Sequence, residues 1–387
     1  MKVVFAHQTG PISQREGGAL RYTLNAIDLL LKNEVETTLI GVQFNEEETI
    51  DRSGFNFIPI LKSSYAKYRW HRYFIRLMVK APFFRLPDSS IIHTCRLDYM
   101  LPFLLFCPKN PKVITSDEPL GYARLHYPEP IFNLIALLYH FVESRSFRRI
   151  DRLITDTATA KEYYEKRYPW LEDKIRIYTT GIDTGKFKPI ERENVRQQFG
   201  LASNEKIVLF AGRLEKIKNL DFLLRAFALV EEKVADAKLL IVGEGSERPN
   251  LEKLAGTLGL RDKIVFMGVI SPEKMPEIYN CADVMALCSV TEGSPTVVRE
   301  AIACGVPVVS TDVGDVSGTI SSEYVGRITE DEEESFADAV VLVLDMAAKE
   351  PLKVREECRK IAKEKFGSEK SIVELIEIYQ EVNKSQG

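Results

Sequence analysis

Short apolar runs alternate with longer amphipathic stretches along most of the chain. Many of the short runs are near-continuous Val, Ile and Leu, which is typical of parallel strands covered on both faces. Their alternation with helical patterns predicts a doubly wound α/β architecture. The predicted strands are 2–6, 37–42, 57–61, 90–94, 113–115, 152–155 and 175–178, then 207–211, 238–242, 264–267, 284–288 and 306–310.

The strand–loop–helix pattern begins twice. A first strand leads through a glycine-containing loop into a helix over 17–32, and a strand at 207–213 leads into a helix over 219–234. Two such openings predict two Rossmann-like domains, residues 1–185 and 186–367. The segment 180–193 is rich in Gly, Asp, Lys and Pro and is the predicted linker. A final amphipathic helix is expected within 368–387, with a buried stripe that includes Ile372 and Tyr379.

Composition excludes several classes of protein. The 387 residues carry a net charge of −4, which argues against a nucleic-acid-binding protein. The six cysteines occur singly, without a C-x-x-C pair, as expected for reduced and mostly buried thiols of a cytoplasmic protein. No secretion signal is visible at the start. The longest apolar stretch, 131–142, falls short of the ~20 residues that a membrane-spanning helix requires.

The segment 283–312 predicts an anion-binding helix start. A buried strand ends near Cys288, Ser294 is a good N-cap residue, and Pro295 suits the first helical position. The helix is expected to run through 296–304 and to end at Gly305. Free N–H groups at such a helix start, at the carboxyl end of a parallel sheet, suit a phosphate.

Two carboxylates flank this helix start. Glu292 lies just before it, and Glu300 lies about a turn and a half inside it. Beside an anion site, carboxylates make sense as acceptors of hydrogen bonds from ligand hydroxyls, one on a ribose and one on a sugar. A surface glutamate and a helix-facing glutamate are the plain alternative.

Cations follow the strand at 207–211. Arg213 lies at the carboxyl edge of the sheet and Lys218 near the next helix start, where the helix dipole disfavours cations. Together they are suited to hold a diphosphate and to stabilise its charge as it leaves, although solvated charges are the alternative. Lys216 is a weaker candidate for the same chemistry. Gly243 and Gly245 form a G-x-G after another strand, a pattern that a tight turn also explains.

These motifs together resemble a known family. Glu292 to Glu300 is an E-x7-E motif followed by A-I-A-C-G-V-P-V-V, and G-R-L-E-K-I-K-N-L at 212–220 and V-G-E-G precede it in the same order and spacing. The segment 207–328 is therefore similar to the retaining, nucleotide-sugar-dependent glycosyltransferases of family four, which have the GT-B fold. The first half matches more loosely, through Gly17-Gly18, the stretch 180–187 and the final helix.

The resemblance implies a GT-B fold of two Rossmann-like domains facing a central cleft, with an acceptor domain at 1–185 onto which helix 368–387 packs back, and a donor domain at 186–367. It implies that Arg213 and Lys218 contact the donor diphosphate. Glu300 would hold the ribose and Glu292 the transferred sugar. The implied donor-binding residues are Gly17, Gly18, Gly243, Gly245, Gly268, Val269, Gly293, Ser294, Pro295, Thr296 and Glu300. No D-x-D motif appears, consistent with family members in which protein cations replace a metal.

Two positions depart from the family pattern. Many members have a histidine in a stretch like V-I-T-x-H, where this chain has V-I-T-S-D-E-P. Asp117 stands at about that place, as a catalytic group that accepts a hydrogen bond from a sugar hydroxyl or as a surface carboxylate. The usual N-G-V-D turn is Thr180-Gly-Ile-Asp183. His93, which ends a different strand, is interpreted as structural.

A basic block in the first half bears on the acceptor. No acidic residue occurs from Arg52 to Pro87, whereas eight lysines and arginines do. An anionic membrane surface contacted through 62–85, or an acceptor that carries phosphate, would attract such a block. A packed helix with a solvated basic face is the alternative. The apolar residues expected on one face of that helix are Trp70, Phe74, Leu77, Met78 and Ala81.

The resulting hypothesis is a metal-independent retaining enzyme without a cofactor. It would move a hexose from a UDP- or GDP-linked sugar to a hydroxyl of a sugar or lipid-linked acceptor, in polysaccharide biosynthesis, in the cytoplasm or at the inner face of the membrane. The alternatives are a soluble synthase of a small glycoside or disaccharide, and a sugar-nucleotide-binding subunit that has lost catalysis.

Overall fold

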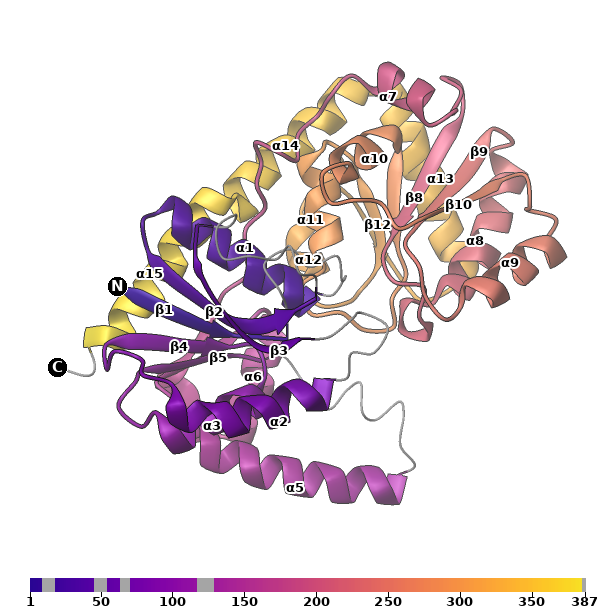
Figure 1. Ribbon diagram of the computed structural model, residues 1–387. Coiled ribbons are helices and arrows are strands. Elements are labelled where there is room, and N and C mark those ends of the chain that lie inside the picture. Colours follow the sequence, from indigo (N-terminus) through magenta and orange to yellow (C-terminus); the bar gives the residue numbers. More distant parts are fainter. Residues whose placement is uncertain (9–17, 45–53, 63–69, 117–128, 385–387) are drawn as a thin grey trace. The chain divides into compact units, whose positions relative to one another are not determined.

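The computed structural model describes residues 1–8, 18–44, 54–62, 70–116 and 129–384 (Figure 1). The chain divides into two compact units. Unit 1 comprises Met1–Thr180 with Glu369–Gly387, and unit 2 comprises Gly181–Ser368. The chain therefore leaves unit 1 at the start of the predicted linker and returns to it at the last helix.

Unit 1 is built on a seven-stranded parallel sheet in the order β3-β2-β1-β4-β5-β6-β7. All seven strands that the apolar runs predict are present, within one or two residues at each end. Their bounds are β1 Lys2–Ala6, β2 Glu36–Gln43, β3 Asn56–Lys62, β4 Ser90–Thr94, β5 Lys112–Thr115, β6 Arg152–Thr155 and β7 Ile175–Ile177.

Helices cover both faces of this sheet (Figure 1). On one face, α1 (Gly18–Lys32) and α15 (Ser368–Lys384) pack against β1 and its neighbours, and α15 buries Ile372, Leu375 and Tyr379 there. On the other face lie α2 (Trp70–Lys80), the 3-10 turn η3 (Ala81–Phe83), α3 (Leu97–Phe106), α5 (Glu129–Phe147), α6 (Ala158–Arg167) and the 3-10 segment η4 (Pro169–Lys174). The buried stripe predicted for the last helix therefore completes the core of unit 1.

A buried hydrogen-bond chain fixes α15 to the sheet. His93 Nδ1 lies 2.7 Å from the Tyr379 hydroxyl, and His93 Nε2 lies 2.7 Å from Thr115 Oγ1. Thr115 in turn donates to the Tyr22 hydroxyl at 3.0 Å. Burial lowers the pKa of His93 to about 3, so the ring is neutral. Both ring nitrogens are hydrogen-bonded within the core, which agrees with the structural interpretation of this histidine.

The predicted apolar face of α2 packs inward. Leu77 and Ala81 are buried and Phe74 packs against the same core, together with Tyr73. The apolar face singled out in the sequence therefore faces the core, and the basic side chains Arg72, Arg76 and Lys80 are exposed on the other side of the helix.

Unit 2 is built on a six-stranded parallel sheet in the order β10-β9-β8-β11-β12-β13. Its strands are β8 Lys206–Ala211, β9 Ala237–Val242, β10 Ile264–Gly268, β11 Val284–Leu287, β12 Val308–Thr311 and β13 Gly326–Thr329. Its helices are α7 Arg192–Gln198, α8 Leu220–Lys233, α9 Arg248–Thr257, α10 Met275–Cys281, α11 Thr296–Ala303, α12 Val316–Thr319, α13 Glu333–Lys349 and α14 Pro351–Phe366, with the 3-10 turn η5 Lys216–Lys218. The sequence pattern missed β13, an edge strand of four residues with only Gly326 buried.

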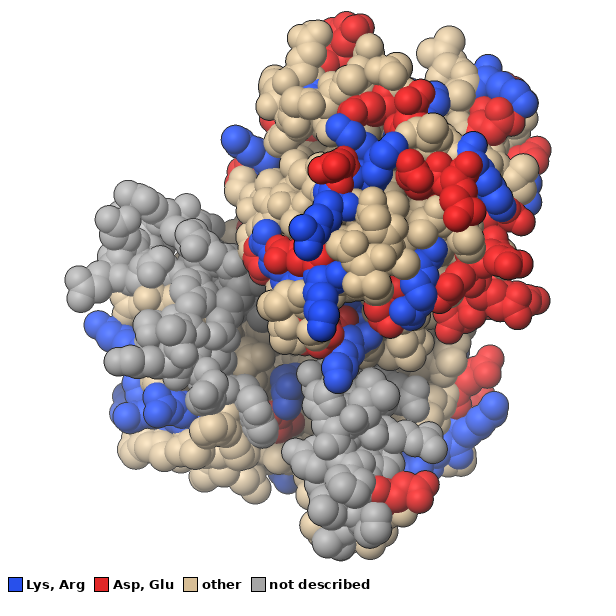
Figure 2. Space-filling model, turned by 90° about the vertical axis from the view of Figure 1, so that its right-hand side faces the viewer, with Lys and Arg blue, Asp and Glu red and all other residues tan. Residues whose placement is uncertain are grey.

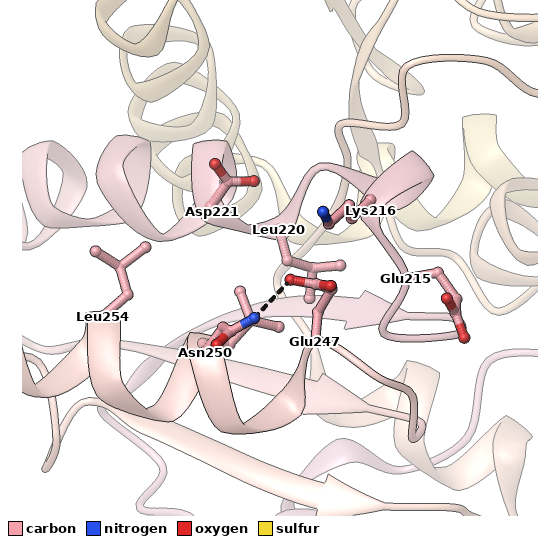
Figure 3. A pocket seen from close by; sticks show the side chains of 8 residues that line it. Glu215, Lys216, Leu220, Asp221, Glu247, Asn250 and Leu254 are labelled. Carbon is pink, nitrogen blue, oxygen red and sulfur yellow. Dashed lines mark hydrogen bonds between the residues drawn. The ribbon is translucent and has the colours of Figure 1, made fainter. Parts of the chain in front are cut away.

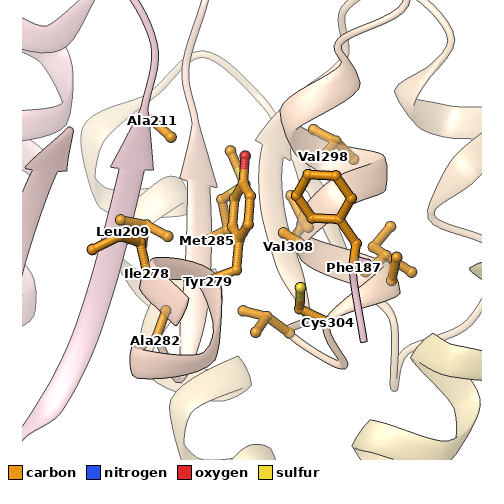
Figure 4. Close-up of a cluster of buried hydrophobic side chains, with 14 of the residues drawn as sticks. Phe187, Leu209, Ala211, Ile278, Tyr279, Ala282, Met285, Val298, Cys304 and Val308 are labelled. Carbon is orange, nitrogen blue, oxygen red and sulfur yellow. The ribbon is translucent and has the colours of Figure 1, made fainter. Parts of the chain in front are cut away.

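The two faces of this sheet have separate cores. α8, α9 and α13 cover one face, and α10, α11 and α14 cover the other. Figure 4 shows the second core, in which Leu209 and Ala211 of β8 meet Tyr279 of α10 and Val298 of α11. This packing sets where α11 begins relative to the ends of the strands.

The cysteines match the composition argument. All six are free, and all but Cys95 are buried. Burial raises the pKa of the Cys281 thiol to about 11, so it stays protonated at neutral pH. None of the helices in the described part of the chain combines the length and apolarity needed to cross a bilayer.

Candidate functional site

The predicted chemistry of unit 2 gathers at one point of its sheet. The chain runs outward from β8 to β9 and β10, then returns to place β11 on the other side of β8. Loops that leave β8 and β11 therefore diverge at their carboxyl ends, which is where ligands bind in open α/β sheets. Arg213 and Lys218 follow β8, and Glu292 follows β11.

Lys218 and Glu292 form the centre of this arrangement. The Lys218 ammonium donates to the Glu292 carboxylate in a part-buried ion pair, with 18% and 14% of the two side chains exposed. Ser289 Oγ donates to the same carboxylate oxygen at 2.6 Å. The backbone joins the two loops as well, because Val290 N donates to Ile217 O at 2.9 Å. The fold thus brings together two residues that are far apart in the sequence.

The predicted glycines bring three loop backbones into contact. A Cβ at Gly243 would lie 1.9 Å from the Gly212 carbonyl oxygen, and one at Gly245 would lie 2.2 Å from the Leu214 carbonyl oxygen. Gly243 also has a φ of +125° and donates its N–H to Gly268 O at 2.8 Å. These glycines are required by close backbone approach, so the tight-turn interpretation alone is insufficient. Val269, next to Gly268, is exposed.

The start of α11 differs from the prediction. The helix begins at Thr296 and Pro295 is its N-cap, so Ser294 lies outside the helix and does not cap it. The Ser294 hydroxyl instead donates to Asp315 Oδ2 at 2.6 Å. Tertiary contact with the loop after β12 therefore prevails over the local capping preference. Burial raises the pKa of Asp315, although the Ser294 hydrogen bond opposes that rise.

The neighbouring loop explains the position of Gly293. A Cβ at Gly314, which has a φ of +58°, would lie 1.8 Å from the Gly293 carbonyl oxygen, and Asp315 N donates to that oxygen at 3.1 Å. The loop after β12 thus supports the one that leads into α11. Gly314 and Asp315 gave no motif in the sequence.

Glu300 is a buried side chain of α11. Tyr279 from α10 donates its hydroxyl to Glu300 Oε2 at 2.7 Å, and the hydroxyl is visible at the edge of the core in Figure 4. Glu300 therefore lies on the inner side of its helix, where a charged group requires polar partners. Nothing in the sequence spacing identifies Tyr279 as one of them.

The remaining predicted residues are Arg213, Gly17, Gly18 and Asp117. Arg213 is exposed and makes no ion pair with the described residues. Gly18 is the first residue of α1 in unit 1. Gly17 and Asp117 lie outside the described residues. The roles of these residues toward a donor stay predictions.

A pocket of about 390 Å³ lies between the start of α8 and α9 (Figure 3). Leu220, Leu251 and Leu254 form its apolar part, and Asn250 donates to Glu247 at 3.0 Å beside it. Lys216 lines this pocket, whereas Lys218 does not. The two lysines of η5 therefore have different surroundings, and Lys218 alone joins the group around Glu292.

Charge on the face shown in Figure 2 is mixed. Lysines and arginines alternate there with aspartates and glutamates, and neither sign dominates the visible surface. Within the described residues, no group of three His, Cys, Asp or Glu side chains is placed to hold a metal ion.

Two family models match the chain. The model described as Glycosyltransferase Family 4 matches residues 16–186, and the model described as Glycosyl transferases group 1 matches residues 191–365. The chain belongs to the group 1 glycosyltransferases of family 4. The resemblance seen in the sequence is thereby confirmed for both halves.

Curated relatives agree with this family. An uncharacterized glycosyltransferase of Methanocaldococcus jannaschii is 35% identical over 191 residues, covering 48% of this chain and 49% of the relative. A D-inositol 3-phosphate glycosyltransferase of Nocardia farcinica is 32% identical over 225 residues, covering 56% and 49%. The chain spans about half the length of the curated relatives that it matches.

Solved structures agree on the fold. Sucrose-phosphate synthase from Thermosynechococcus elongatus has a TM-score of 0.81 at 19% identity, covering 99% of both chains. Anabaena Alr3699/HepE in complex with UDP and glucose has a TM-score of 0.76 at 17% identity, covering 98% of this chain and 100% of that one. The predicted GT-B fold with two Rossmann-like domains is confirmed.

Proposed function

We propose that this glycosyltransferase moves a hexose from a UDP- or GDP-linked sugar to a hydroxyl acceptor, with retention of configuration. The Lys218–Glu292–Ser289 group carries the proposal, because it places a cation and a carboxylate side by side at the carboxyl edge of the sheet. A nucleotide sugar has both a diphosphate for the cation and sugar hydroxyls for the carboxylate. The HepE structure, which contains UDP and glucose, has the same fold.

The ion pair between Lys218 and Glu292 must open when the donor binds. Lys218 is neutralised by Glu292 in the unliganded chain, so an incoming diphosphate must compete with that carboxylate. When the ammonium turns to the phosphates, Glu292 is left to accept hydrogen bonds from hydroxyls of the hexose. Lys218, with Arg213, then stabilises the negative charge that builds on the diphosphate as the glycosidic bond breaks.

The nucleotide would lie along the glycine loops. Gly243 and Gly245 bring their loop against residues 212–214, and the base and ribose would lie beside this paired backbone. Glu300 would accept hydrogen bonds from the ribose hydroxyls, with Tyr279 holding its carboxylate in place. The first residue of α11, Thr296, and the preceding Gly293 and Ser294 would offer N–H groups to the phosphates.

We further propose that the reaction needs no metal and no cofactor. Arg213, Lys218 and the first N–H groups of α11 supply positive charge where a metal-dependent transferase uses a divalent ion. The absence of a D-x-D motif from the sequence supports this proposal. Activity that persists in excess chelator is the expected result.

Two acceptor classes have support. A lipid-linked glycan at the inner membrane face is favoured by the basic block of unit 1. A soluble acceptor that carries phosphate is favoured by relatives whose names specify inositol 3-phosphate and sucrose-phosphate. Both acceptors are anionic, and the first is preferred here because exposed apolar side chains accompany the basic ones.

A thermal-shift screen tests the donor half directly. UDP, GDP, ADP and their sugar conjugates are added to the full chain, and one nucleoside diphosphate series is expected to raise the melting temperature. The stabilising conjugate is then followed for slow release of the nucleoside diphosphate. Binding without release would favour a subunit that has lost catalysis, and no stabilisation by any nucleotide would overturn the proposal.

A further inference from the structure

Helix α5 of unit 1 exposes several large apolar side chains and buries a carboxylate. Leu137, Leu138, Phe141 and Val142 are exposed, with 68%, 59%, 58% and 39% of their surfaces in contact with solvent. Their spacing places them on one side of the helix. Four large apolar side chains in one stripe are more than the scattered exposure that is normal on a soluble surface.

The opposite side of α5 carries a buried carboxylate. Glu143 is fully buried, and its Oε2 accepts hydrogen bonds from the Tyr168 hydroxyl at 2.7 Å and from His140 Nδ1 at 3.0 Å. Burial raises the pKa of Glu143. A helix that only faced water would turn Glu143 outward and the leucines inward. The exposed leucines of α5 therefore lack the burial that they would have in an ordinary surface helix.

Cations border the stripe. The Arg145 guanidinium lies 4.7 Å from the centre of the Phe141 ring, and Arg148 and Arg149 follow as exposed residues. Between residues 136 and 149 the buried Glu143 is the only acidic residue. The exposed surface of residues 136–149 is therefore apolar with a positive border.

Helix α2 and η3 repeat this combination. Ile75, Val79 and Phe83 are exposed to 55%, 58% and 80%, although the other side of the helix packs into the core. The exposed cations among them are Arg72, Arg76, Lys80 and Arg85. This outward stripe is distinct from the inward face on which Leu77 lies.

The two stripes belong to the same side of unit 1. Helix α3 contacts both α2 and α5, and Figure 1 shows all three helices on one side of the sheet. The Arg149 guanidinium also donates to the Leu104 carbonyl, which joins the end of α5 to α3. Beside that bond, Leu105 and Phe106 at the end of α3 add two exposed apolar side chains. We call the exposed residues of α2, η3, the end of α3 and α5 the basic-apolar face.

We propose that the basic-apolar face docks on the surface of a bilayer that contains anionic lipids. Its apolar side chains enter the boundary between headgroups and acyl chains, and its arginines and lysines pair with lipid phosphates. Charge complementarity favours this occupant, because the face is cationic in a chain of net charge −4. The proposal goes beyond the donor chemistry of unit 2 and holds even if the acceptor is soluble.

Vesicle flotation with the full chain tests the proposal. Vesicles of phosphatidylcholine alone are compared with an equal mixture of phosphatidylcholine and phosphatidylglycerol, at low and high salt. The chain is expected to float with the mixed vesicles, and high salt is expected to weaken its binding. Absence from the mixed-vesicle fraction at low salt would overturn the proposal and would favour an acidic protein as the partner.

Paired variants locate the contact. Leu138→Ser with Phe141→Ser, and separately Arg76→Glu with Lys80→Glu, are each expected to weaken binding by about tenfold or more. Leu342→Ser with Leu352→Ser, and Lys349→Glu with Lys360→Glu, make matched changes at exposed positions of unit 2 and should leave binding unchanged.

Folding and donor chemistry are measured separately. Thermal unfolding and lipid-free release of nucleoside diphosphate should match wild type in all four double variants, because none alters the donor residues. Equal loss of binding in the unit 2 controls would overturn the assignment to this face. Failure of the donor assay in wild type would count against the proposed reaction and would leave the flotation result standing.

Discussion

Replacing Lys218 by alanine tests the centre of the proposed site. Its ammonium is the cation that the fold places against Glu292, with only 18% of the side chain exposed. The loss of one well-placed group that stabilises developing negative charge costs about 3 kcal/mol, which corresponds to roughly a hundredfold in turnover. The same change leaves the mostly buried Glu292 carboxylate with Ser289 as a remaining partner. The loss of the ion pair is expected to lower the free energy of unfolding by about 1–3 kcal/mol.

The chain provides a matched control two residues earlier. Lys216 belongs to the same 3-10 turn, but it is exposed and lines the pocket beside α9. Lys216→Ala is expected to change turnover little and stability by no more than about 0.5 kcal/mol. Similar losses in the two variants would show that general positive charge near this turn suffices, and the specific role of Lys218 would be abandoned.

Replacing Glu292, the partner of Lys218, is expected to have a different effect on nucleotide affinity. Glu292→Gln removes the carboxylate that competes with the diphosphate for Lys218, so affinity for the free nucleoside diphosphate should rise or stay level while turnover falls. Lys218→Ala should lower both. Titration calorimetry with the nucleoside diphosphate, combined with release of that product from the sugar conjugate, separates these outcomes. Near-normal turnover of Lys218→Ala would refute the reasoning, because the diphosphate would then lie elsewhere.

Three further predictions concern other contacts. Glu300→Ala should weaken nucleotide binding by about tenfold, and unchanged affinity in calorimetry would exclude the ribose assignment. Gly243→Ala should cost about 3 kcal/mol or more in unfolding free energy, because its Cβ would meet a carbonyl oxygen 1.9 Å away, whereas Gly200→Ala, with a φ of +68° and open space, should cost about 1–2 kcal/mol. His93 has its pKa lowered to about 3 when folded, so the unfolded chain binds the extra proton and stability should fall as pH drops from 6.5 toward 3. Chemical denaturation across this pH range should show that the free energy of unfolding depends less steeply on pH in His93→Gln than in the wild type. An equal dependence in the two chains would contradict the role given to His93.

The strands were predictable because parallel strands covered on both faces are nearly continuous apolar runs. The exception was β13, where Gly326 is buried but Arg327 is exposed, so the short run has no such signature. Helix α11 was placed correctly within about a residue, yet its cap was wrong. Ser294 has the right residue type for a cap, and only the position of Asp315 shows that its hydroxyl is engaged elsewhere.

The candidate site also contains residues that the sequence identifies and partners that only the structure shows. Glu292, Glu300 and Lys218 could be named from motif and spacing, because their residue types imply their chemistry. Their partners could not, because Ser289 and Tyr279 belong to no motif and act only through the packing of separate elements. The outward face of α5 was also missed, since a buried Glu143 reverses the usual relation between polarity and exposure.

The sequence by itself determined the alternation of strands and helices, the two-part division and the residues that carry charge to the ends of β8 and β11. These follow from local periodicity and residue chemistry, which a single chain displays along its length. Only the tertiary structure decided that Lys218 is neutralised by Glu292, that the glycines serve close backbone approach, and that leucines of α5 face outward. Such features depend on which distant segments meet, and local pattern does not encode that.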